Sequence, residues 1–181
     1  MTKVLCTADN HLGYRQYGIL EREQDLYKSF EKLLDLAIAM EVDAITVSGD
    51  LLHTNRPTSA TIAFLKECNN KLMDAKIPAF VVAGNHDQAK PNWLQNLCDS
   101  GSYTEGVGGF FVLKNEHVQV GTMKIFGAPF TNKNDWHTNV YEKVPQDTDI
   151  LLMHQSFNEF IDFKTEDGFC ADDVKDVAKH V

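Results

Sequence analysis

Four short apolar segments, each followed within three residues by acidic, amide or imidazole side chains, most constrain what this chain can fold into. They span residues 4–7, 44–47, 79–82 and 150–153. Short runs of apolar and β-branched residues that end at Gly, Ser or Asn are typical of buried strands. In open α/β sheets, ligands bind just beyond the carboxyl ends of the strands. The segments therefore predict strands that deliver their polar residues to one shared site.

The polar residues that follow these segments belong to types that bind metal ions. They are Asp9, Asn10 and His11, then Asp50 and His53, then Asn85, His86 and Asp87, and finally His154. Divalent ions of the manganese, iron and zinc kind accept imidazole and carboxylate ligands together, and an amide oxygen is also suitable. Asp9 and His11 can face one cavity. Asp50 can then bridge two ions, with Asn85 and His154 on the second. Two ions about 3.5–4 Å apart, bridged by a carboxylate and a hydroxide, promote in-line displacement at phosphorus.

Further residues near these ligands are candidates for catalysis and substrate binding. His86 follows Asn85 directly and precedes Asp87, so it is placed to protonate a leaving oxygen while the carboxylate orients its ring. His53 could hold the substrate phosphate in line. The candidate substrate contacts are Asn10, Arg15 and Arg56.

The periodicity of the chain predicts how these strands are connected. Apolar residues at helical spacing predict a helix over about 23–40 and a second over about 59–74, the first of them a right-handed crossover between parallel strands. The segments 110–113, 117–120 and 123–126 are predicted to be antiparallel hairpin strands. We expect a polar loop over 131–144, and a helix that reaches Val181.

Composition limits the classes of protein that remain. With 181 residues, 43% of them hydrophobic, the chain is predicted to form one domain, residues 1–181. It has no apolar run of membrane-spanning length, and its four cysteines are scattered, so we expect a cytoplasmic or nuclear protein with no membrane partner. A net charge of −9 argues against a basic nucleic-acid face. Bound divalent ions would supply the missing positive charge, although the acidity could simply maintain solubility.

The motifs together resemble those of the calcineurin-like metallophosphoesterases. The matching residues are Asp9-Asn10-His11, Gly49-Asp50, Gly84-Asn85-His86-Asp87 and His154. The longer runs 9–14, 49–58 and 154–155 are similar to the meiotic-recombination/SbcD branch, the double-strand-break repair nucleases of cells and their phage equivalents, which would act in the host cytoplasm.

The resemblance implies a fold, an activity and partners. The implied fold class is α/β (α+β), a four-layer αββα sandwich. The implied activity is two-metal hydrolysis of DNA, as endonuclease and 3′-to-5′ exonuclease, with Mn²⁺ as the first choice of ion and Mg²⁺ as the second. The implied partners are DNA, a coiled-coil ABC-type ATPase and a second copy of the chain, with dimer contacts from 58–75 and 88–98. The implied metal ligands are Asp9, His11, Asp50, Asn85 and His154, with His86 as catalytic acid, Asp87 supporting it and His53 positioning the phosphate.

One family motif is absent, and other functions remain open. The final Gly-His-x-His motif of the family, which gives each ion one more ligand, does not occur in the sequence. We therefore expect an incomplete nuclease domain, truncated at its C-terminus, without the capping domain and the ATPase-binding tail. The alternatives are a phosphoesterase that acts on phosphoproteins or small phosphodiesters, and a catalytically incomplete scaffold.

Overall fold

The structure, a computed structural model, describes residues 1–88, 94, 96, 102–160 and 168–180. Its strands are β1 (Val4–Thr7), β2 (Ala44–Ser48), β3 (Pro78–Val82), β4 (Gly109–Val112), β5 (Glu116–Val120), β6 (Met123–Ala128) and β7 (Ile150–Met153). Its helices are α1 (Leu20–Ala39), α2 (Ser59–Ala75) and the short α4 (Lys133–Asp135). Single helical turns cover Gln16–Gly18, Trp136–Val140, Tyr141–Lys143 and Ala171–Asp173.

The strands form two sheets. The first sheet has the order β1-β2-β3-β4, and all its neighbours are parallel. The second has the order β5-β6-β7, with an antiparallel β5–β6 hairpin and a parallel β6–β7 pair. The hairpin was predicted from the sequence. The prediction that 110–113 is also an antiparallel hairpin strand is wrong, because β4 pairs in parallel with β3.

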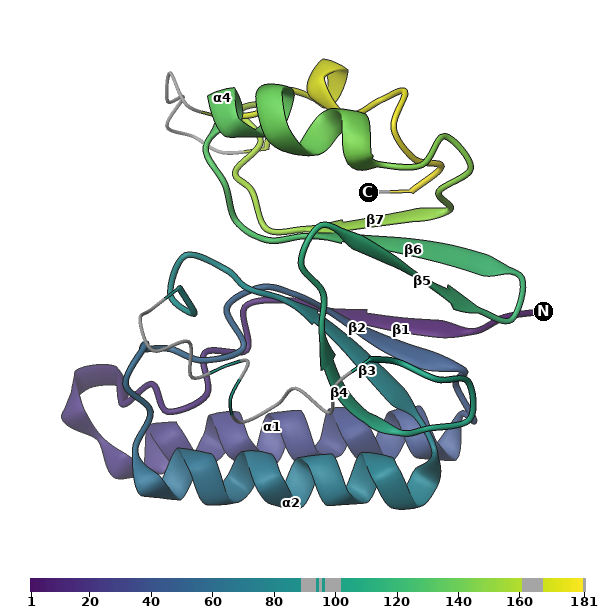
Figure 1. The fold of residues 1–181 in the computed structure, drawn as a ribbon. Helices are drawn as coiled ribbons and strands as arrows, with labels where there is room; N and C mark the ends of the chain where they lie inside the picture. The colour runs from purple at the N-terminus through teal and green to yellow at the C-terminus, as the bar shows by residue number, and fades with distance from the viewer. Residues whose placement is uncertain (89–93, 95, 97–101, 161–167, 181) are drawn as a thin grey trace.

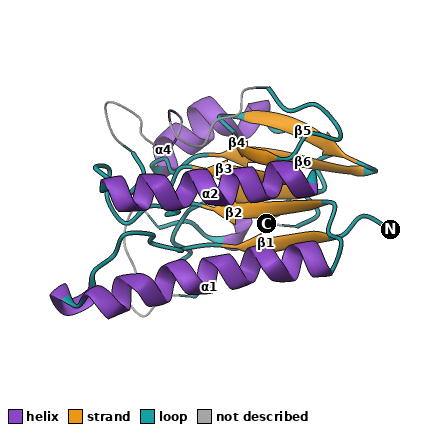
Figure 2. Cartoon of the chain, turned by 90° about the horizontal axis from the view of Figure 1, so that it is seen from below, coloured by secondary structure: helices purple, strands orange, loops and turns teal. Residues whose placement is uncertain are grey.

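The two sheets lie face to face between helical layers (Figure 1). α1 and α2 cover the outer face of the first sheet, and Figure 2 shows them side by side across it. α4, the helical turns after it and the C-terminal segment cover the outer face of the second sheet. Each of the three interfaces between layers holds its own cluster of buried apolar side chains. This is the predicted four-layer αββα sandwich.

The two long helices follow from apolar spacing. Phe30, Leu34 and Ala37 of α1 are buried, as are Leu65 and Leu72 of α2. Residues three, four or seven apart lie on one face of a helix, so both helices bury one stripe against the sheet. Both predicted helices are confirmed, with ends shifted by a few residues.

The outer layer of the second sheet differs from the sequence prediction. The expected polar loop over 131–144 instead contains α4 and two helical turns, and Trp136 within it is completely buried. The predicted C-terminal helix is a short 3-10 turn followed by turns. Val181, residues 161–167 and most of 88–98 lie outside the described residues. No helix in the described part of the chain combines the length and apolar character needed to span a bilayer.

Candidate metal centre

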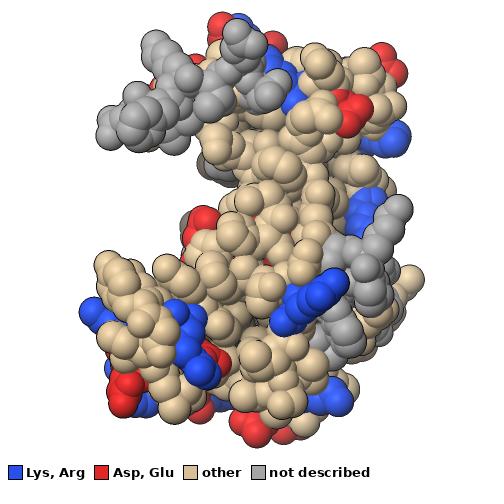
Figure 3. Space-filling view, turned by 90° about the vertical axis from the view of Figure 1, so that its left-hand side faces the viewer, with Lys and Arg blue, Asp and Glu red and all other residues tan. Residues whose placement is uncertain are grey.

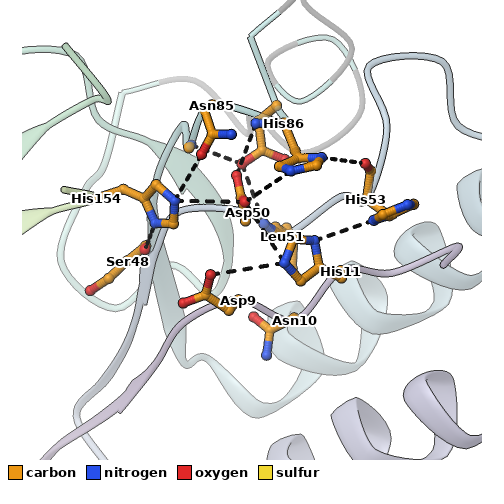
Figure 4. Close-up of polar contacts among 12 residues, drawn as sticks. Asp9, Asn10, His11, Ser48, Asp50, Leu51, His53, Asn85, His86 and His154 are labelled. Atoms are coloured by element: carbon orange, nitrogen blue, oxygen red, sulfur yellow. Dashed lines mark hydrogen bonds and ion pairs between the residues drawn. The ribbon is translucent and has the colours of Figure 1, made fainter. Parts of the chain in front are cut away.

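The polar residues that follow β1, β2, β3 and β7 converge at one edge of the sandwich (Figure 4). The loops after β1 and β2 run side by side, because their main chains are hydrogen-bonded. The His11 amide donates to the Asp50 carbonyl at 2.9 Å, and the Leu12 amide donates to the Leu51 carbonyl at 2.9 Å. The His53 amide donates back to the Leu12 carbonyl at 3.1 Å. The two loops therefore form one hydrogen-bonded unit that holds five of the polar motif residues.

Three candidate ligands have an unusual backbone conformation. Asp9, His11 and Asp50 have φ angles of 52°, 45° and 48°. Non-glycine residues adopt this left-handed region rarely and at a cost in free energy, and they persist there only where the surrounding structure holds them. The hydrogen bonds between the two loops provide that constraint. Backbone strain is therefore present at three of the residues that face the site.

The Asp50 carboxylate lies at the centre of the site. Its side chain is only 3% exposed, and its Oδ1 atom accepts a hydrogen bond from the His86 amide at 3.0 Å. Its Oδ2 atom lies 3.8 Å from His11 Nε2, 3.9 Å from His86 Nε2 and 3.6 Å from His154 Nε2. These distances are too long for hydrogen bonds. They match the separation of ligand atoms on one ion, because two atoms each about 2.1 Å from an ion lie roughly 3–4 Å apart.

His154, the contribution of the second sheet, is oriented by a backbone carbonyl. Its Nδ1 atom lies 2.8 Å from the Ser48 carbonyl oxygen, which can only accept, so Nδ1 carries the proton. The lone pair of Nε2 then points to Asp50 and to Asn85 Oδ1, which is 3.2 Å away. A metal-binding histidine is commonly oriented in this way by a hydrogen bond to its other nitrogen.

The donor atoms form two adjacent groups that fit divalent ions. One group contains Asp9, Asp50 and His154, and the other contains His11, His53 and His86. Within each group the donor atoms lie within 4.8 Å of one another. Asp50 belongs to the first group, and its Oδ2 atom also faces two histidines of the second. The structure therefore brings all five predicted ligands to one place, since Asn85 adds its oxygen beside His154.

The two histidines with predicted catalytic roles lie beside this centre. The His86 Nδ1–H donates to the His53 carbonyl at 2.8 Å, so Nε2 faces Asp50 and the open side of the site. Burial, together with the neighbouring imidazoles of His11 and His86, lowers the pKa of His53. The Tyr14 ring lies on the His53 ring with centroids 4.0 Å apart. This aromatic support was missed at the sequence level, where Tyr14 is only one polar-loop residue among several.

The structure gives Asp87 different partners from the expected one. Its carboxylate accepts hydrogen bonds from three backbone amides, those of Leu51 at 3.3 Å, Leu52 at 2.9 Å and Gly84 at 3.0 Å. Burial raises the pKa of Asp87, and the hydrogen bonds from the Gly84 and Leu52 amides oppose that shift. The His86 ring is oriented by a carbonyl instead. Asp87 therefore joins the loop after β2 to the loop after β3.

The three predicted substrate contacts differ in how free their side chains are. The Arg15 guanidinium is paired with the buried carboxylate of Glu23, with Nε and Nη2 at 2.9 Å and 2.8 Å from Oε2. Asn10 donates to Thr7 Oγ1 at 3.0 Å, and its buried Oδ1 has no partner in the described structure. Arg56 is exposed on the loop before α2. The Arg15 pairing was missed at the sequence level. The signal that could have predicted it is the acidic residue Glu23 on the buried face of α1.

The comparisons with known proteins identify the family. The family model of the calcineurin-like phosphoesterases matches residues 2–179. The chain belongs to this family. A crystal structure superimposes with a TM-score of 0.54 at 15% sequence identity, over 91% of this chain and 74% of its own, a likeness that shows the fold alone.

Curated relatives narrow the similarity within the family. The chain is 44% identical over 171 residues to the DNA double-strand break repair protein Mre11 of Sulfurisphaera tokodaii, covering 90% of this chain and 43% of the relative. It is 36% identical over 166 residues to the Mre11 protein of Methanococcus maripaludis, covering 85% of this chain and 44% of the relative. It is 31% identical over 170 residues to that of Haloferax volcanii, with shares of 92% and 37%. The chain thus spans less than half the length of these relatives.

Proposed function

We propose that this chain is the phosphodiesterase domain of a metal-dependent DNA nuclease that acts in double-strand-break repair. The observation that supports it is the Asp50 carboxylate, surrounded by three imidazoles and an amide oxygen where four strands end. Carboxylate, imidazole and amide-oxygen donors gathered at one place suit divalent ions, and we propose two, Mn²⁺ before Mg²⁺. The choice of DNA as substrate comes from the relatives, which are named as DNA double-strand break repair proteins.

The metal ligands proposed for this centre are Asp9, His11, Asp50, Asn85 and His154. When bound, the ions would supply positive charge to the phosphoryl oxygens and lower the pKa of the attacking water. The buried carboxylate of Asp50 keeps its place between the two groups because its Oδ1 atom is held by the His86 amide. His154 keeps its Nε2 lone pair toward the centre because its other nitrogen is bonded to Ser48.

His86 is the proposed general acid. Its Nδ1–H is engaged by the His53 carbonyl, so a protonated ring presents Nε2–H to the open side of the site. Charged imidazole can give that proton to the leaving oxygen of the DNA backbone. His53, held between Tyr14 and His86, is the proposed positioning residue for the scissile phosphate. Asp87 supports His86 and His53 by joining the loop after β2 to the loop after β3.

The wider assembly is part of the same proposal. In it the chain works as a homodimer with a coiled-coil ABC-type ATPase, cuts DNA internally and also degrades it from 3′ ends. Arg56 is the proposed contact to the DNA backbone, because its side chain is exposed beside the motif after β2, whereas Arg15 is held by Glu23. Asn10 remains a proposed substrate contact, and in this structure its side-chain amide donates to Thr7 Oγ1.

A His86→Ala variant tests the proposed division of roles. We expect cleavage of single- and double-stranded DNA in Mn²⁺ to fall by at least about a hundredfold, the typical contribution of a general acid. We expect Mn²⁺ binding, measured by calorimetry, to stay within a factor of about two of the wild type. His117→Ala is the matched control, because His117 is an exposed histidine on β5. Loss of Mn²⁺ binding in the His86 variant would make His86 a ligand and contradict the proposal.

A further inference from the structure

The metal centre opens into a cavity with two chemically different walls. The cavity has a volume of ≈ 520 Å³. One wall carries the proposed ligands Asp9, Asp50 and His154, and the other carries the aromatic rings of Phe130, Phe157 and Phe160. Pockets of this size accept small organic ligands. A ligand that reaches the metal centre through this cavity therefore contacts an apolar, aromatic surface as well.

The aromatic wall has one anchored ring and one free ring. Phe157 is half-buried and packs on buried Phe169, with ring centroids 6.1 Å apart. Phe160 is 82% exposed, with its centroid 6.4 Å from that of Phe157. Its amide donates to the Phe157 carbonyl at 3.0 Å, so the two rings are presented on one turn. A phenylalanine this exposed contributes little to the core, and beside a cavity it is available to a ligand.

Protein side chains supply little positive charge to a polyanion in this cavity. None of the described residues that line it is Lys or Arg, and the chain has a net charge of −9. Figure 3 looks onto this edge of the molecule, and the described atoms around the hollow on its left side are tan or red. Proteins that bind single strands combine a backbone contact with aromatic rings on which bases stack. In this cavity the bound ions would contact the phosphate, and the aromatic rings would be free to contact the base.

We propose that Phe160, supported by Phe157, is a stacking platform for an unpaired nucleobase next to the phosphate at the metal centre. The ligand class is the unpaired end of a DNA strand. Inside a duplex, both faces of a paired base are covered by its neighbours, whereas an unpaired base at a strand end can offer its face to the ring. This inference rests on the proposed nuclease function and specifies which form of DNA its site takes.

Base stacking can be measured directly with 2-aminopurine, whose fluorescence falls when it stacks on an aromatic ring. The probe is a single strand of about eight nucleotides with 2-aminopurine at its 3′ end, titrated with the 181-residue chain in Mg²⁺. We expect the fluorescence to be quenched on binding. Phe160→Leu, which keeps an apolar side chain but removes the ring, should lose the quenching and weaken binding at least about fivefold. Phe160→Tyr, which keeps the ring, should retain both.

Three further results separate this inference from the nuclease proposal. Cleavage of DNA by the wild-type chain without quenching of 2-aminopurine, or with equal quenching in Phe160→Leu, would overturn the platform and leave the nuclease proposal intact. Quenching that depends on the ring without cleavage in Mn²⁺ would support the platform and contradict the nuclease activity of this chain. Failure of the strand to bind at all would contradict both.

Discussion

The two sheets contribute to the metal centre in different ways. The first sheet supplies three loops, after β1, β2 and β3, that are joined by main-chain hydrogen bonds and by the buried carboxylate of Asp87. The second sheet supplies one proposed ligand, His154, and the aromatic wall of the cavity. Its outer layer is built from short helical turns around Trp136. The comparison indicates that the first sheet sets the positions of most proposed ligands through its joined loops. The second sheet completes the site with the side chain of His154 and with aromatic rings.

Removal of Trp136 should produce the largest effect on stability and should act mainly on the second sheet. Its side chain is fully buried against Phe169 and Val140. Trp136→Ala should lower the free energy of unfolding by about 3–5 kcal/mol in urea titrations. Amide hydrogen exchange should accelerate more in β6 and β7 than in β2. Equal acceleration of hydrogen exchange in both sheets would mean that the two sheets unfold together as one cooperative unit. Tyr141→Ala, at a partly exposed neighbour, should cost under about 1 kcal/mol.

Asp87 offers the corresponding test in the first sheet. Asp87→Ala leaves the amides of Leu51, Leu52 and Gly84 without their acceptor. We expect a loss of about 2–4 kcal/mol, because buried donors without partners are costly. Asp74→Ala, at an exposed position of α2, is the control and should change stability by less than about 0.5 kcal/mol. A small effect of Asp87→Ala would show that the loops hold their conformation without this carboxylate.

Gly49 is where the two sheets meet at the site. A Cβ atom at this position would lie 2.4 Å from His154 Cγ, and the residue has a φ of +80°. Gly49→Ala should weaken Mn²⁺ binding at least about tenfold by displacing His154. Gly18→Ala is a matched control, because Gly18 has a φ of +72° with no atom within 4 Å of the added Cβ. It should cost about 1 kcal/mol of stability and leave Mn²⁺ binding unchanged. Similar Mn²⁺ affinities in both variants would argue that His154 is not a ligand.

The smallest effect concerns the edge of the second sheet and depends on pH. Lys179 forms an ion pair with Asp149, and this pair and the Lys124 amide lower the pKa of Asp149 from its ordinary value of 3.8. The pair therefore stabilises the folded protein above about pH 4, and this contribution is lost as the pH falls through the lowered pKa. Protection of the Leu151 amide, which donates to the His180 carbonyl, should decrease on acidification. Lys179→Gln should weaken this pH dependence. An unchanged pH dependence would show that the Lys179–Asp149 ion pair is not its cause.

Much of the first sheet could be predicted from the sequence, because its signals are local. The spacing of Phe30 and Leu34 marks a helix, and Asp50 follows the strand-like run 44–47 after only Ser-Gly. Strand exits in a parallel sheet share one edge, so the ligand residues could be brought together without knowing the loops. The second sheet carries weaker signals. The pairing of β4 depends on contacts distant in sequence, and the segment around Trp136 has too short an apolar pattern to mark a helix.

The contacts that orient the site could not be predicted from residue types. Asp87 follows His86 in the sequence and suggested a side-chain pair, yet its carboxylate meets three backbone amides. The carbonyls that orient His154 and His86 belong to Ser48 and His53, and any residue type would supply them. Main-chain partners leave no trace in the sequence, which is why the convergence of the candidate ligands could be predicted and the contacts that support them could not.

The most direct test of the account is a calorimetric titration of Mn²⁺ into this chain and into its Asp50→Asn variant. Asp50 lies within 4 Å of proposed ligand atoms of His11 and of His154, one from each group, so the account predicts that the wild type binds two ions and that the variant loses both sites together. Circular dichroism of the variant should show that it remains folded. Retention of either site in the folded variant would contradict the central claim that one carboxylate unites the two groups.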